Sequence, residues 1–284
     1  MKKSLFLSDI PAQYRDPATA KVVIVPVPYD ATSSWVKGAD KGPAAILDAS
    51  ATVENYDIEC DCEPYKVGIF TDKTVNEKRT PEKMAAAVEK RISQHLSANR
   101  FPIVLGGEHS VSIGAIAAQV KKYKKLTVLQ LDAHADLRDK YHGSKFNHAC
   151  VMARARDLCK TVQVGIRSMD LSEKPRVKKN NVFFAEKIQG GRNWISKVVS
   201  LLERNVYVTI DLDVFDPSIM PSTGTPEPGG LLWYETLDLL RQVFRNANVT
   251  GFDVVEMCPN PANKAPDFLA AKLIYKLISY KFAK

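Results

Sequence analysis

Short apolar runs rich in Val, Ile and Leu alternate along this chain with longer amphipathic segments. The strand candidates are Val22–Val27, Lys66–Phe70, Pro102–Leu105, Leu126–Leu131, Thr161–Ile166, Val182–Phe184, Val206–Leu212 and Val249–Val255. The helical patterns are Pro81–Ala98, Ser110–Tyr123, Asn193–Glu203, Tyr234–Asn246 and Asp267–Phe282. Runs that are apolar throughout are typical of strands covered on both faces. The order of these elements therefore predicts a mostly parallel sheet with helices on both sides, and ligands at the carboxyl ends of its strands.

The composition narrows the class of protein. The 284 residues contain no repeat or linker-like stretch, so a single domain spanning 1–284 is expected. The net charge of +8 comes from scattered lysines without a nucleic-acid-binding motif, which indicates a solvated surface and no nucleic-acid partner. Asp9 ends the first apolar run too early for a secretory signal, and no run approaches the ~18 residues of a membrane span. Five cysteines without CxxC spacing disfavour disulfides and structural zinc, and fit a cytoplasmic location.

Two predicted strands lead directly into acidic residues. The residues are Asp132, His134 and Asp136 after the first of these strands, and Asp211 and Asp213 at the end of the second. In an extended chain, i, i+2 spacing directs side chains to the same face. A carboxylate at the end of a buried strand is costly unless it is paired, hydrogen-bonded or metal-bound. Four such carboxylates would repel one another, and divalent cations resolve that conflict.

A third segment adds a candidate ligand. His109 follows the predicted strand Pro102–Leu105 and the glycine pair Gly106-Gly107, which permits close backbone approach at a turn. Alone, His109 would more often be structural, but the two acidic clusters reverse that preference. Two histidines and four aspartates suit manganese better than zinc or magnesium, because zinc prefers fewer and softer ligands and magnesium rarely takes histidine.

Together these segments resemble the ureohydrolase family of arginases, agmatinases and their relatives. The family pattern GGxHS appears at residues 106–110, DAHxD at 132–136, and SxDxDxxDPxxxPxxGTP at 209–226, with Thr209 in place of the serine. Residues 28–43 look like the family's substrate-side segment, although Leu47 stands where the family often has arginine. Residues 253–259 are similar to its guanidinium-binding segment, so the resemblance covers nearly the whole chain.

The resemblance implies a fold, a cofactor and a reaction. The fold would be the arginase-like three-layer αβα sandwich, assembled as a homo-trimer or homo-hexamer. Two Mn²⁺ ions would be held by His109, Asp132, His134, Asp136, Asp211 and Asp213. The enzyme would release urea from a small cationic guanidino substrate, most simply agmatine, which gives putrescine.

The chemistry assigns roles to three further positions. Two metals that share a water lower its pKa from about 16 to about neutral, and such a water can attack the guanidinium carbon. Glu256 would pair with the guanidinium nitrogens, and Asp213 would accept a hydrogen bond from the intermediate. The amine leaves protonated, so a histidine is needed to carry the proton and contact the substrate. His148 lies 14 residues after His134, nearer the family's separation than His142 at 8 residues, so His148 is assigned this role.

Substrate choice depends on Arg138. Arginase-like members have asparagine at this position, where it helps to hold the amino-acid end of arginine. The absence of this asparagine favours agmatine as the substrate, while arginine, guanidinobutyrate and aminopropylagmatine stay open as alternatives.

Three other interpretations of the function remain open. Cys150 beside His148 could act as a nucleophilic pair, but the acids would then have no role. A non-catalytic polyamine-binding protein on the same fold would be expected to lose metal ligands, whereas all six are present. A two-metal phosphatase fits the ligands, although an acidic pocket repels phosphate.

Overall fold

The centre of the molecule is one sheet of eight parallel strands. The computed structural model describes residues 5–283. Its strands are β1 (Val22–Val27), β2 (Ile69–Thr71), β3 (Phe101–Gly106), β4 (Leu126–Leu131), β5 (Lys160–Ile166), β6 (Val182–Phe184), β7 (Asn205–Asp211) and β8 (Asn248–Val255). The order across the sheet is β2-β1-β3-β8-β7-β4-β5-β6, and each neighbouring pair is parallel. The predicted parallel sheet is confirmed.

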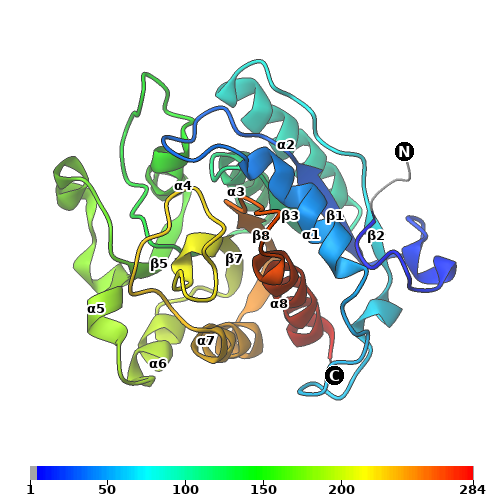
Figure 1. Cartoon of the computed structure of the whole chain (residues 1–284). Helices are drawn as coiled ribbons and strands as arrows, with labels where there is room; N and C mark the ends of the chain where they lie inside the picture. The colour runs from blue at the N-terminus through cyan, green and yellow to red at the C-terminus, as the bar shows by residue number, and fades with distance from the viewer. Residues whose placement is uncertain (1–4, 284) are drawn as a thin grey trace.

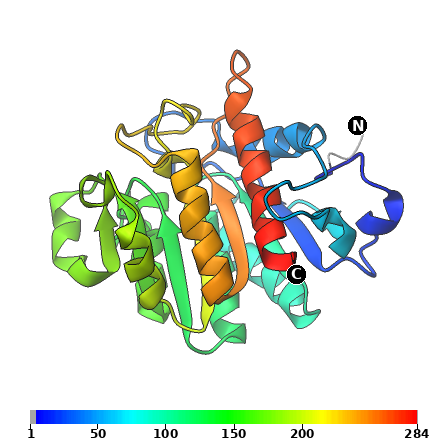
Figure 2. The same cartoon turned by 90° about the horizontal axis from the view of Figure 1, so that it is seen from below.

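Helices cover both faces of this sheet (Figure 1). They are α1 (Gly42–Ser50), α2 (Pro81–Ser97), α3 (Val111–Lys122), α4 (Val151–Leu158), α5 (Ala185–Ile188), α6 (Asn193–Ser200), α7 (Trp233–Asn246) and α8 (Ala265–Phe282). Apolar residues of α1, α6, α7 and α8 share one core cluster with the strands. Those of α2, α3 and α4 share the other. Figure 2 shows α7 and α8 side by side across the sheet. The result is the expected three-layer αβα arrangement.

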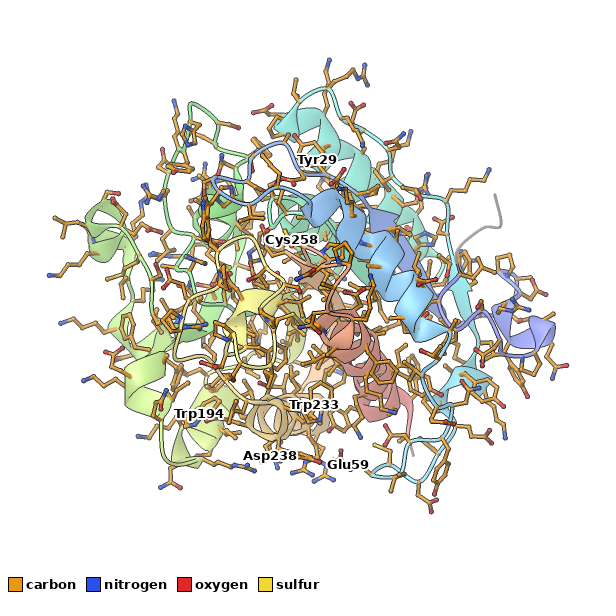
Figure 3. All side chains as sticks on the ribbon, in the orientation of Figure 1. Tyr29, Glu59, Trp194, Trp233, Asp238 and Cys258 are labelled. Atoms are coloured by element: carbon orange, nitrogen blue, oxygen red, sulfur yellow. The ribbon has the colours of Figure 1, made fainter. Side chains whose placement is uncertain are left out.

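The strands are apolar throughout because successive side chains enter different layers. In β1, Val22 and Ile24 pack in the cluster with α1 and α8, whereas Val23 and Val25 pack in the cluster with α2 and α3. Alternation of side chains in a strand thus buries every position once both faces are covered. Trp194 of α6 and Trp233 of α7 pack on the first of these layers (Figure 3).

Some boundaries differ from those predicted. The strand expected at Lys66–Phe70 begins only at Ile69, because Pro64–Val67 form a 3-10 turn and Gly68 adopts φ 83° before the strand. The helices α1, α4 and α5 were not predicted, because they are short, with nine, eight and four residues. Leu47, where the family often has arginine, is buried in α1 and contributes to the core. Within residues 5–283, no helix has the length and apolar character needed to cross a membrane.

Candidate metal centre and substrate pocket

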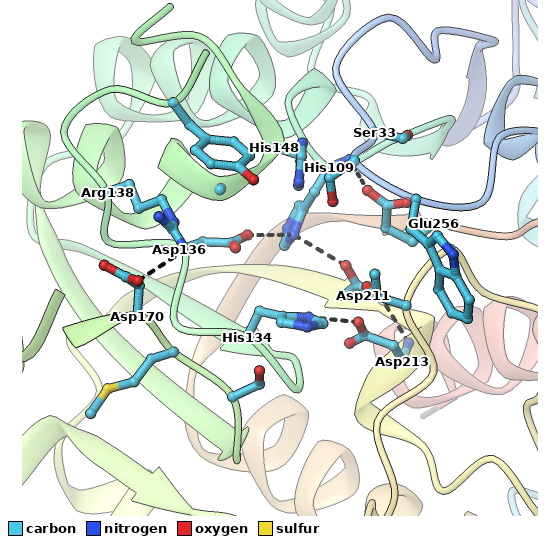
Figure 4. A pocket seen from close by; sticks show the side chains of 18 of the residues that line it. Ser33, His109, His134, Asp136, Arg138, His148, Asp170, Asp211, Asp213 and Glu256 are labelled. Atoms are coloured by element: carbon cyan, nitrogen blue, oxygen red, sulfur yellow. Dashed lines mark hydrogen bonds and ion pairs between the residues drawn. The ribbon is translucent and has the colours of Figure 1, made fainter. Parts of the chain in front are cut away.

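Four neighbouring strands deliver the candidate residues to one edge of the sheet. In the order β3-β8-β7-β4, their carboxyl ends lead to His109, Glu256, Asp211 and Asp132, respectively. Parallel strands place these ends together, which is where α/β folds collect ligands. Figure 4 shows the side chains of His109, Asp211 and Glu256 directed into one pocket.

The first group of ligands surrounds the Nδ1 atom of His109. This atom lies 3.1 Å from Oδ2 of Asp132, 3.1 Å from Oδ2 of Asp136 and 3.4 Å from Oδ2 of Asp211. It is buried and has no aligned hydrogen-bond partner among the described residues. On the other side of the ring, Nε2 lies 2.8 Å from the hydroxyl of Thr209.

Thr209 shows which ring nitrogen of His109 carries the proton. Its hydroxyl donates to Oδ1 of Asp253 over 2.7 Å, so its oxygen accepts from Nε2–H of His109. Nδ1 then presents a bare lone pair to three carboxylates. Orientation of a metal-binding histidine by a hydrogen bond from its other nitrogen is the usual arrangement at metal sites. The residues present therefore fit a divalent ion, and Thr209 supplies the hydroxyl of the serine that it replaces.

A second group of ligands shares one member with the first. Ligand atoms of Asp132, His134 and Asp213 lie within 4.8 Å of one another, as do those of His109, Asp132 and Asp211. In the second group, Nδ1 of His134 is 2.8 Å from Oδ2 of Asp213 and 3.6 Å from Oδ1 of Asp132. Asp132 thus directs one oxygen to each group. This arrangement can hold two cations side by side.

The electrostatics of the buried acids favour cations. Burial, together with the charges of Asp213 and Asp132, raises the pKa of Asp211 well above its usual range. Burial, together with the negative charge of Asp132, raises the pKa of Asp136 to about 7. Acids in such surroundings take up either protons or positive charge. A pair of divalent ions supplies that charge without protonating the ligands.

The explanation from strand alternation was wrong, even though the residues meet. Only Asp211 belongs to a strand, and Asp213 lies in the 3-10 turn Leu212–Val214, where its N–H donates to Oδ1 of Asp211 over 2.9 Å. Asp136 has φ 51°, far from extended backbone. Tight turns after the strands therefore bring the side chains at i and i+2 together, and the alternation of side chains along an extended strand does not.

Glu256 and His148 complete the pocket. Glu256 has φ 65°, and its Oε1 accepts the backbone N–H of His109 over 2.7 Å. Burial and the charge of Glu108 raise the pKa of Glu256 well above its usual range. Burial lowers the pKa of His148 to about 4. Both side chains line the same cavity as five of the six candidate ligands, namely His109, His134, Asp136, Asp211 and Asp213.

The sequence was then compared with known proteins. The profile of the arginase family matches residues 20–279. This chain belongs to the arginase family. It is 39% identical over 274 residues to an N(1)-aminopropylagmatine ureohydrolase of Synechocystis sp., covering 93% of this chain and 90% of that protein. It is 34% identical over 272 residues to an agmatinase of Pyrococcus horikoshii, covering 91% of each. The crystal structure of agmatine ureohydrolase of Thermoplasma volcanium is similar with a TM-score of 0.87, 31% identity, and coverage of 99% of this chain and 95% of that chain.

In this member of the arginase family, the outer part of the pocket carries charges of both signs. The guanidinium of Arg138 lies 3.8 Å from Oδ2 of Asp170 and 3.9 Å from Oε2 of Glu173, and it stacks 4.6 Å from the ring centre of Tyr141. All four residues line the cavity. Sequence reasoning missed Asp170 and Glu173, although both follow the carboxyl end of β5. The collection of ligands at the carboxyl ends of parallel strands could have indicated the loop after β5.

Two other sequence candidates lie apart from the pocket lining. His142 has φ 46° in the turn Tyr141–Ser144 and is not among the residues that line the cavity. The Cys150 thiol is buried, and burial followed by the charge of Asp136 raises its pKa to about 11. A thiol in these surroundings is inert, because the thiolate is the nucleophile. The buried thiol of Cys150 therefore gives no support to a nucleophilic Cys150–His148 pair.

Proposed function

We propose that this chain hydrolyses a cationic guanidino compound to urea and an amine, with agmatine as the substrate and putrescine as the amine product. The observation that carries the proposal is the sharing of Asp132 between two ligand groups beside the Glu256 carboxylate. The first feature suits a pair of metal ions that activate water. The second suits a planar guanidinium.

Manganese is the proposed metal. Four aspartates, namely Asp132, Asp136, Asp211 and Asp213, would provide oxygen ligands, and His109 and His134 would provide one nitrogen each. An oxygen-rich set with a minority of imidazole suits Mn²⁺ better than the four-coordinate sites typical of zinc. The bare Nδ1 of His109 supports the assignment, since magnesium seldom takes a histidine ligand.

The residues of the pocket supply binding and proton transfer. When bound, the metal pair would lower the pKa of a shared water to about neutral. Glu256 pairs with the guanidinium and fixes its plane, and the positive charge of the substrate keeps this carboxylate ionised. Asp213 accepts a hydrogen bond from a nitrogen or oxygen on the reacting carbon. His148 donates a proton to the leaving amine as the carbon–nitrogen bond breaks.

The outer pocket favours a substrate whose far end is cationic. Arg138 brings one positive charge, whereas Asp170 and Glu173 bring two negative charges within 4 Å of it, at 3.8 and 3.9 Å. The net charge of this region is therefore negative. An amine at the far end of agmatine is attracted to it, while the carboxylate of arginine or guanidinobutyrate is not.

Aminopropylagmatine is the second candidate substrate. A relative at 39% identity carries that name, against 34% for the agmatinase. The mouth of the pocket also suits a longer chain, because Trp35 and Met169 line it and are 70% and 41% exposed. Such apolar side chains can cover the methylenes of a polyamine.

Urea release from a panel of guanidines tests the proposal. The chain is stripped with a chelator, reloaded with Mn²⁺, and given agmatine, aminopropylagmatine, arginine or guanidinobutyrate. We expect bound manganese at two equivalents and urea from agmatine or aminopropylagmatine only. A His109→Asn variant is the matched control and is expected to lose both metal and turnover. Bound metal without urea from any guanidine contradicts the proposal and favours a polyamine-binding protein or a phosphatase.

We further propose a domain organisation, an oligomeric state and a location for this chain. The continuous sheet supports one domain for residues 1–284. The family resemblance supports a homo-trimer or homo-hexamer, which light scattering after gel filtration would measure. The cysteines are all free thiols in the part of the chain that is described, which supports a cytoplasmic location.

A further inference from the structure

The buried carboxylate of Glu108 has no part in the chemistry described so far. It lies between the glycine pair after β3 and His109, and its side chain is fully buried. Neither ligand group includes it. Three donors converge on it: the Ser110 N–H at 3.0 Å, the Ser110 hydroxyl at 2.8 Å and the Thr32 hydroxyl at 2.8 Å. A buried acid with this many donors is held in one orientation.

Thr32 connects this carboxylate to His148. Its Oγ1 lies 3.2 Å from Nδ1 of His148 and accepts the backbone N–H of the same residue over 3.1 Å. A threonine hydroxyl has one hydrogen to donate. Because that hydrogen is donated to Glu108, the oxygen of Thr32 can only accept from the imidazole. Nδ1 of His148 therefore carries a proton, and Nε2 is the ring nitrogen left for the pocket.

We propose that Thr32 and Glu108 are positioning residues, which hold His148 with Nδ1 protonated so that Nε2 exchanges the proton with the substrate. The proposal rests on the proposed function of His148 as the proton carrier. It extends that function to two residues on other segments of the chain. The arrangement has the logic of a catalytic triad, in which a carboxylate fixes the tautomer of a histidine, with a hydroxyl inserted between them.

The proton balance of the reaction shows why the orientation and tautomer of His148 matter. Water adds its oxygen to the guanidinium carbon, the bond from this carbon to the substituted nitrogen breaks, and both protons of the water end on the leaving amine. One of these protons passes through Nε2 of His148, which is briefly an imidazolium. Burial of His148 and the positive charge of Lys37 disfavour that form. A negative charge on Glu108, transmitted through Thr32, offsets their effect.

Charged Glu108 is consistent with its surroundings. All three donors can donate only if the oxygens of the carboxylate accept, which the ionised form does best. Were Glu108 protonated and donating to Thr32, the hydroxyl would point to Nδ1, and His148 would carry its proton on Nε2 instead. The ionised and the protonated states of Glu108 therefore predict opposite tautomers of His148.

Removal of the Thr32 hydroxyl tests the first part of the proposal. In the manganese-loaded enzyme, we expect Thr32→Val to lower kcat for agmatine on the order of 10- to 100-fold, which is a part of the general acid–base contribution. The KM and the manganese content are expected to stay near those of the wild type. Thr32→Ser keeps the hydroxyl and is expected to restore most of the rate. Thr52→Val, which removes an exposed hydroxyl in another loop, is the matched control.

The other outcomes of this experiment overturn the proposal. An unchanged kcat in Thr32→Val means that the hydroxyl has no role in proton transfer. A parallel loss of manganese means that Thr32 supports the metal centre instead. A Thr32→Ser variant as slow as Thr32→Val means that the methyl group, and not the hydroxyl, is what matters.

The tautomer can be measured without turnover. The full chain is labelled with ¹⁵N-histidine, loaded with diamagnetic Zn²⁺, and its imidazole nitrogens are observed by NMR, with His148→Asn used to assign the signal. We expect Nδ1 of His148 to be protonated, and this preference to weaken in Thr32→Val. A proton on Nε2 in the wild type overturns the proposal. A wild type that releases no urea from any guanidine refutes the proposed function separately, and the tautomer remains measurable.

Discussion

The backbone N–H of His109 donates a hydrogen bond of 2.7 Å to Oε1 of Glu256, although the two residues are 147 positions apart. One is a proposed metal ligand and the other is the proposed guanidinium partner. Since β3 and β8 are neighbours in the sheet, this contact would fix the distance between bound cations and a guanidinium paired with Glu256. Positioning of this kind lowers the barrier by holding the reacting atoms in place.

Glu256→Gln is therefore expected to separate binding from metal loading. The amide oxygen can still accept the His109 N–H, but the charge that pairs with the guanidinium is lost. We expect kcat/KM for agmatine to fall by roughly 10³-fold or more, because a buried charge partner is worth about 2–5 kcal/mol. Steady-state kinetics with metal analysis checks this. A loss below tenfold, or a loss of manganese in parallel, contradicts the assigned role.

The two histidine candidates differ in their position relative to the pocket. His148 lines it, and His142 lies in the turn beyond. His148→Asn is expected to lower kcat by about 10²- to 10⁴-fold, the usual contribution of a general acid or base. His142→Asn is the control, for which we expect turnover close to wild type. A larger loss in the His142 variant would reverse the assignment.

Asp170 is expected to affect substrate affinity more than rate. Its carboxylate stands near Arg138 at the outer pocket, where it is 44% exposed, so solvent screens its charge. We expect Asp170→Asn to raise the KM for agmatine by roughly fivefold, equivalent to about 1 kcal/mol, with little change in kcat. Asp157→Asn removes an exposed charge from α4 and serves as the control. Equal KM values in both variants would show that the far amine does not meet Asp170.

Asp216 gives a prediction about stability and pH. Hydrogen bonds from Ser218 and from glycine N–H groups lower the pKa of Asp216 to about 2, against its usual 3.8. A lowered pKa stabilises the folded state above the unfolded pKa, and this contribution is lost as the pH falls through the folded value. Asp216→Asn should reduce the free energy of unfolding by about 1 kcal/mol at pH 6.

The difference between Asp216→Asn and the wild type should then shrink as the pH falls from about 4 to about 2. Urea denaturation of both proteins across this range, with a chelator present to remove the metal contribution, measures it. A difference that stays constant down to pH 2 would show that the carboxylate charge makes no contribution at this turn.

The sheet and its ligand-bearing ends were predictable, whereas the surrounding loops were not. β4 and β7 are apolar runs that stop at acids, and that pattern is local in the sequence. The positions of Thr32 and Asp170 depend on how loops fold back over the strand ends, and no period marks such segments. The rule that ligands collect at the carboxyl ends of parallel strands predicted the region of the site, but it did not predict Thr32 or Asp170. Glu108 was visible in a motif, yet its role depends on a partner 76 positions away.

The contact between Gly107 and Tyr29 joins the segment after β1 to the segment after β3. A Cβ at Gly107 would collide with the Tyr29 backbone, and the N–H groups of Gly107 and Glu108 donate to the carbonyls of Val27 and Tyr29 over 2.9 and 2.8 Å. These main-chain hydrogen bonds tie the start of the loop that carries Thr32 to the end of β3. Met169, which also lines the pocket, belongs to a different loop that these hydrogen bonds do not hold. Substitutions in that loop are therefore expected to change the pocket more readily than a substitution at Gly107.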